Sequence, residues 1–137
     1  MKYKNEGEIL EIVRAFENGT IARTEWRHAE HLTVAPYYVL HQDSDAALIK
    51  MRDGIFSLLK AFAVNFSKEM PYHETLTVFW LKTVDDYAKS HADNDLMEIG
   101  NALIEIFDKD FSLKFYSRKL LFSNEARAEY VAGDLKR

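Results

Sequence analysis

The stretch DSDAALIKMRDGIFSLLKAFAVNF, from Asp43 to Phe66, carries apolar side chains at intervals of three and four residues. This is the period of an α-helix with one apolar face. Asp43 and Ser44 are residue types that cap a helix start, so we predict a helix from either of them to about Asn65. Its core-facing stripe, which is typical of a helical bundle, consists of Leu48, Met51, Ile55, Leu59, Phe62 and Phe66.

The rest of the chain carries the same signal. Only five glycines and two prolines occur in 137 residues, so turns are few and many short strands are disfavoured. We predict an all-α, single-domain helical bundle of about five to six helices over residues 1–137. The segment Phe111–Phe122 fits either a helix or an extended strap. The other predicted helices are Glu6–Glu17, Glu25–His41 with a kink or break at Pro36, His73–Ser90, Asp95–Phe107 and Asn124–Val131.

Composition excludes several classes of function. The net charge is -4 and no basic cluster occurs, although nucleic-acid binding needs a basic face that neutralises phosphates. The chain has no cysteine, which leaves His, Asp and Glu as the available metal ligands. No apolar run approaches the roughly 20 residues of a membrane span, and the N-terminus lacks the apolar core of a signal peptide. We expect no nucleic-acid partner, no membrane and a cytoplasmic location.

Two segments, EWRHAEHL (25–32) and YHETLT (72–77), place histidines where helical periodicity predicts the protein interior. His28 shares an apolar stripe with Leu32, and His31 lies about 60° further around the same helix. His73 begins the stripe of a later helix. We therefore predict that His28, His31 and His73 converge on one polar site inside the bundle.

A buried imidazole needs hydrogen-bond partners, and near a helix start the dipole favours its neutral form. Neutral imidazole binds metals or acts as a base, so these three residues are candidate ligands of one divalent metal ion. The spacing HxxH alone is a weak metal signal, and a purely structural polar network stays open. Glu25 and Glu74, each within a turn of a site histidine, are the candidate catalytic or orienting carboxylates.

Further candidates lie near these histidines and in the C-terminal third. The candidate ligand-binding residues are Tyr72, Ser117, Arg118 and Arg127. Either arginine would hold a carboxylate or phosphate by its forked geometry. The alternative is that each arginine anchors a helix end or pairs with a surface acid.

The same segments resemble an uncharacterised family of small bacterial all-helical proteins with the patterns EWxHxxHL, YHxTLTxFW and YSR…LFSxEAR. The matching stretches are 25–32, 72–80 and 116–127, so the likeness spans most of the chain. The family often has Thr where this chain has Arg27. The resemblance implies a signature of His28, His31, His73, Ser117, Arg118 and Arg127, and it implies no activity.

Three functions remain open from the sequence. The first is a His-lined internal pocket that binds a small ligand, with or without a metal, and supports metal-assisted hydrolysis or proton transfer if the chain is an enzyme. The second is a non-catalytic anion or metabolite-binding protein. The third is a structural or interaction module, in which the histidines join helices and the aromatic strap contacts a partner or forms a homodimer.

Overall fold

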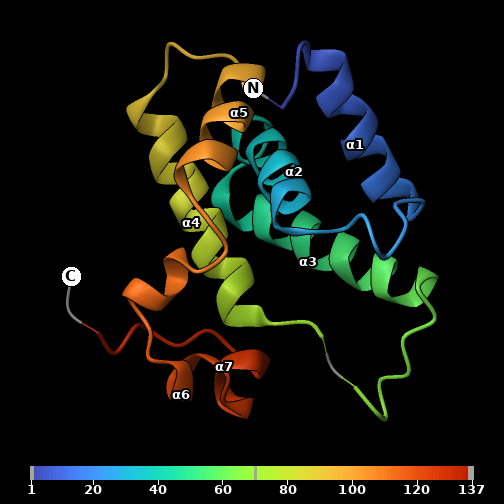
Figure 1. Cartoon of the computed structure of the whole chain (residues 1–137), viewed down its shortest axis with the longest axis vertical. Coiled ribbons are helices and arrows are strands. Elements are labelled where there is room, and N and C mark those ends of the chain that lie inside the picture. The colour runs from blue at the N-terminus through green and yellow to red at the C-terminus, as the bar shows by residue number, and fades with distance from the viewer. Residues whose placement is uncertain (1, 70, 136–137) are drawn as a thin grey trace.

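The computed structural model describes residues 2–69 and 71–135, and it is helical with no strand in those ranges. The predicted all-α class is confirmed. Among the described helices, none is long and apolar enough to cross a membrane. The five long helices are α1 (Glu6–Asn18), α2 (His28–His41), α3 (Ser44–Ala61), α4 (Glu74–Ser90) and α5 (Leu96–Ile106), and the short elements are η1 (Phe111–Lys114), α6 (Arg118–Leu121) and α7 (Asn124–Ala128) (Figure 1).

Local sequence explains most helix ends. Several helices begin at a side chain that accepts a hydrogen bond from a first-turn N–H group. These capping residues are Asn5, Asp43, His73, Asp95, Ser117 and Ser123. Gly19 ends α1 in the left-handed conformation, with a φ of 68° that glycine adopts without strain.

Helix α2 is the centre of the bundle and packs against α1, α3, α4 and α5. Its residues from Leu32 to Pro36 are all buried, so this middle part of the helix is surrounded by protein on every side. One prediction about it was wrong, because the helix begins at His28 rather than Glu25, after an extended Arg27. The helix continues through Pro36, so of the predicted kink or break around Val34 to Tyr37 no break occurs.

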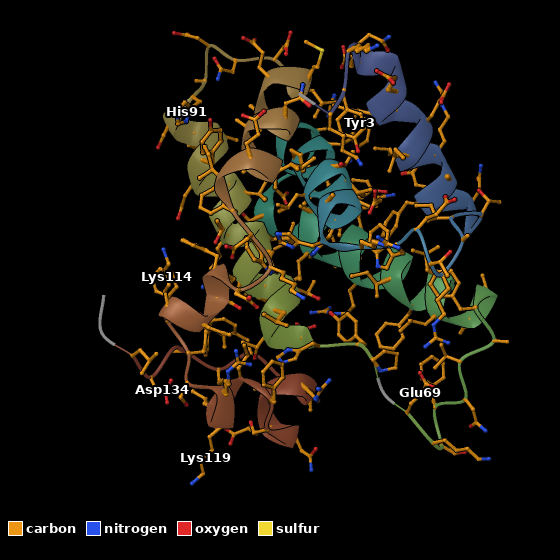
Figure 2. The ribbon with its side chains drawn as sticks, in the orientation of Figure 1. Tyr3, Glu69, His91, Lys114, Lys119 and Asp134 are labelled. Atoms are coloured by element: carbon orange, nitrogen blue, oxygen red, sulfur yellow. The ribbon has the colours of Figure 1, made fainter. Side chains whose placement is uncertain are left out.

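The N-terminal segment is fixed to this centre by buried polar contacts. Tyr3 lies beside α1 in Figure 2, and its hydroxyl is 2.6 Å from the hydroxyl of Thr33 in α2. The Tyr3 backbone N–H donates to the Asn101 side chain of α5 at 2.8 Å, and that amide donates back to the Tyr3 carbonyl. Burial of these groups is tolerated because each polar atom has a partner.

The C-terminal lobe, residues 111–135, packs beside the start of α4 (Figure 1). The predicted alternatives for 111–122 were a helix or an extended strap, and the structure has two short helical segments with a turn between them. Thr75 of α4 holds the lobe, since its hydroxyl donates to the Glu129 carbonyl and accepts from the Val131 N–H. Tyr116 closes the lobe on itself by donating to the Val131 carbonyl at 2.6 Å.

Gly54 of α3 lies against Phe16 of α1. A Cβ atom at this position would stand 2.2 Å from ring atoms of Phe16, which is fully buried. We expect Gly54→Ala to lower the free energy of unfolding, because overpacking costs about 1–3 kcal/mol while the gain in helix propensity is about 1 kcal/mol. Urea denaturation measures the loss, with the exposed Ser57→Ala as a control in the same helix. A Gly54→Ala variant as stable as the wild type would contradict the close packing.

Candidate functional site

The three predicted histidines line one hollow between α2 and α4. We call it the histidine pocket, and its volume is about 260 Å³. His28 and His31 come from the first turns of α2, while His73 caps α4. The remaining lining residues are Trp26, Ile55, Pro71, Tyr72, Leu76, Thr77, Trp80 and Lys109. The structure thus brings His73 to the same hollow as His28 and His31, which lie more than 40 residues before it in the sequence. The walls of the hollow are largely apolar.

His31 has the least satisfied side chain of the three. Its Nε2 atom is sealed from solvent and has no hydrogen-bond partner among the described residues. Burial, with a smaller contribution from the neighbouring His28, lowers the pKa of His31 to about 4. The ring is therefore neutral at pH 7 and presents an unpaired nitrogen inside the protein.

His28 is tied to α5 rather than left free. Its Nε2 lies 2.9 Å from the carbonyl oxygen of Phe107, the residue that ends α5. A carbonyl only accepts, so this nitrogen carries the proton. The ring also meets the edge of Trp80, with 4.8 Å between ring centroids.

His73 uses both of its ring nitrogens on the backbone. Its Nδ1 accepts from the Leu76 N–H at 3.1 Å, which caps α4. Its Nε2 must therefore carry the proton, which it donates to the Leu121 carbonyl of α6 at 2.6 Å. Burial is the largest cause that lowers the pKa of His73, the bond to Leu121 opposes it, and the charge of Arg127 adds to it.

This geometry does not support the predicted three-histidine metal centre. Each metal ligand needs an unprotonated nitrogen with a free lone pair, and His73 has none while its two backbone bonds are formed. Within residues 2–69 and 71–135, no group of three or more His, Cys, Asp or Glu side chains is arranged to hold a metal ion. The three rings share a hollow, but two of them are anchored to other helices.

Glu74 is not placed as a base for the histidines. Nε of Arg52 donates to one of its carboxylate oxygens at 3.0 Å, and the Tyr72 hydroxyl donates to the same oxygen at 2.6 Å. Burial alone would raise the pKa of Glu74, but the hydrogen bonds from Arg52 and Tyr72 outweigh it and the pKa is lowered. The carboxylate is ionised at neutral pH and is held by an ion pair, so the predicted catalytic role is not supported.

Other predicted site residues lie away from the histidine pocket. Glu25 is exposed and lines a surface hollow with Lys2, Thr24, Arg27, Ala29 and Glu30. Arg118 is exposed at the start of α6. Ser117 caps that helix, and its N–H and hydroxyl both donate to Asp134, which lowers the pKa of that carboxyl. These residues are separated from the histidines because the turn before α2 and the C-terminal lobe orient them outward.

Tyr72 and Arg127 do line hollows, and they share one of them. Tyr72 belongs to the histidine pocket and also to a second hollow, in which Arg127 is found. Three charged lining residues, Arg52, Lys109 and the exposed Glu129, were missed by the sequence analysis. Arg52 lies on the polar side of α3 and Lys109 in a loop, and neither position carries a sequence pattern that distinguishes it from a solvated surface charge.

No family model, curated protein or solved structure matches this chain. The interpretation of the site therefore depends on the geometry and chemistry of its own residues.

Proposed function

We propose that the histidine pocket binds a small, partly apolar ligand that forms a hydrogen bond with Nε2 of His31. The observation that carries the proposal is that His31 lines this hollow while its Nε2 has no protein partner. Because the nitrogen is covered in the unliganded protein, the ligand reaches it by displacing a side chain of the wall. An unpaired buried polar atom costs about 1–3 kcal/mol, and a ligand that pairs with it removes that cost.

The walls of the pocket define the kind of ligand. Trp26 and Trp80 provide flat apolar surface, and Thr77 adds a polar edge. Ligand pockets for drug-sized molecules usually measure about 300–1,000 Å³, so a hollow of about 260 Å³ favours a smaller molecule. Because burial keeps His31 neutral at pH 7, it offers a hydrogen bond and no full charge. A ring with one hydroxyl or amide group fits these features.

A second candidate function is structural, and a specific observation favours it. His28 and His73 connect their helices to the ends of α5 and α6 through the carbonyls of Phe107 and Leu121. In this alternative the histidines serve to connect helices of the bundle, and the hollow between them binds no ligand. It gives His31 no role, because this residue has no bond through Nε2.

A thermal-shift screen with small phenols, amides and heteroaromatic compounds tests the two candidates. A compound at a hundred times its Kd stabilises the folded state by about 2.7 kcal/mol, which raises Tm by several degrees. We expect such a shift in the wild type and its loss in His31→Leu. His91→Gln is the control, since His91 ends α4 at the opposite end of the molecule from the C-terminal lobe (Figure 2). Shifts that persist in His31→Leu, or none in the wild type, would favour the structural function.

A further inference from the structure

A second hollow lies between α3, the start of α4 and α7, and its volume is about 530 Å³. We call it the arginine pocket and define it by Arg52, Phe56, Tyr72, Asn124, Arg127 and Tyr130. It is about twice the size of the histidine pocket and shares only Tyr72 with it. The hollow combines three aromatic rings with two guanidinium groups, so it offers both apolar surface and positive charge to a ligand.

The charge of Arg52 is already balanced. Its guanidinium donates through Nε and Nη2 to the two carboxylate oxygens of Glu74. This is the paired, forked geometry in which arginine and a carboxylate bind most strongly. Arg52 and Glu74 therefore form a rigid neutral side of the pocket, which the Tyr72 hydroxyl reinforces by donating to the same carboxylate.

Arg127 has no such partner. It is half-buried, and within the described ranges no carboxylate lies within ion-pair distance of its guanidinium. Its guanidinium carbon lies 5.9 Å from the centre of the Phe122 ring, which carries no charge. The other acid of the lining, Glu129, is exposed, and it holds the lobe through its backbone carbonyl rather than its carboxylate. A cation withdrawn from water without a counter-charge favours the binding of an anion.

We propose that the arginine pocket binds a small aromatic carboxylate, with the carboxylate on the guanidinium of Arg127 and the ring among Phe56, Tyr72 and Tyr130. A guanidinium presents paired N–H donors that match both oxygens of a carboxylate. An aromatic ring among other aromatic rings gains offset or edge contacts in addition to burial. The Asn124 amide on the same lining supplies further donors.

This inference goes beyond the proposed function because it concerns a different hollow and a different ligand charge. The two sites meet at Tyr72, whose hydroxyl is fixed on Glu74. A ligand in the arginine pocket contacts a ring that also lines the histidine pocket, but it needs no group from His31. The two proposals can therefore fail separately.

Titration of the full chain with benzoate at pH 7, followed by calorimetry and amide NMR, tests the inference. A probe of this size is expected to bind with a Kd of about 1 mM or below. Arg127→Gln should weaken binding at least tenfold, since the only unpaired cation of the pocket is removed. Arg127→Lys keeps the charge without the fork and should weaken binding less. Arg118→Gln removes the same charge from the exposed start of α6 and should leave the Kd unchanged.

Benzyl alcohol, which has the ring without the carboxylate, should bind at least tenfold more weakly than benzoate. His31→Leu should bind benzoate as the wild type does, which separates this site from the histidine pocket. Wild-type protein that does not bind benzoate at about 10 mM, or Arg127→Gln and Arg127→Lys variants that both bind it with the wild-type Kd, would overturn the inference. Circular dichroism establishes that each variant is folded.

Discussion

Lowering the pH from 7 to 4 is expected to reduce the free energy of unfolding by about 3 kcal/mol through His31 alone. Burial, together with the nearby His28, lowers the pKa of His31 to about 4, whereas the unfolded chain has the ordinary value near 6.5. Between these values the unfolded state binds the extra proton, so stability falls as the pH falls. Above pH 6.5 the contribution of the neutral ring is complete. The lowered pKa of His73 adds a loss of the same sign.

Urea denaturation at pH 7, 6, 5 and 4 measures this dependence, with His31→Leu as the comparison. Other groups also contribute to the pH dependence, including Glu74, whose lowered pKa in the folded state makes stability fall on acidification, so the difference between the two proteins isolates His31. Leu fills a similar volume and needs no hydrogen bond. The variant should therefore be about 1 kcal/mol more stable than the wild type at pH 7, and the gap should widen on acidification. Parallel pH curves for the two proteins would contradict a neutral His31 with a buried Nε2.

His73→Leu is expected to lower the free energy of unfolding by about 2–4 kcal/mol. The substitution removes the cap of α4, which costs about 1 kcal/mol, and leaves the Leu121 carbonyl without its donor. Both losses occur at a site where the exposed fraction of His73 is 7%. They also loosen the junction between α4 and the C-terminal lobe, so amide hydrogen exchange should increase in residues 118–128.

His73→Asn separates the two contributions. Asparagine is a good N-cap and keeps the bond to the Leu76 N–H, but it is too short to replace the bond to Leu121. Its loss should be about half that of His73→Leu, with the same increase in exchange over the lobe. His41→Gln is the control, because the Nδ1 of this exposed histidine bonds only the Tyr37 carbonyl of its own helix. A His73→Leu protein within 0.5 kcal/mol of the wild type, the ordinary range for a surface substitution, would contradict the double anchoring.

Most helices could be predicted because the residues that determine where they begin and end lie within or next to each helix. The bounds of α1 and α5 differ from the predicted ones by no more than one residue at each end, since the apolar period, Asp95 and the Asn18–Gly19 end are all encoded within a few residues. The start of α2 could not be predicted this way. Trp26 stacks on Phe16 of α1, with 5.0 Å between ring centroids, in the turn that precedes the helix. That contact joins residues ten positions apart in sequence and does not depend on helix propensity.

In the candidate site, too, one part could be predicted from local sequence and another part depends on contacts between distant segments. Periodicity placed His28, His31 and His73 toward the interior, and the structure has all three on one hollow. Periodicity carried no information about the atoms that their nitrogens bond. The Phe107 and Leu121 carbonyls lie 79 and 48 residues away from their histidines. No such partner reaches Nε2 of His31, which is buried and unpaired among the described residues.

Arg127 and Arg118 show the same distinction. Both belong to the C-terminal third, Arg118 beside Lys119 and Arg127 between Glu125 and Glu129, and neither pattern predicts which of the two lines a hollow. In the folded chain Arg127 lines a hollow beside α3, while Arg118 is exposed to solvent. By itself the sequence determined the helical class, most of the caps and the inward faces, because hydrogen bonds within a helix and apolar spacing act over a few residues. Only the tertiary structure decided which polar atoms are paired and which stay unpaired, because each partner comes from a distant segment that packing brings into reach.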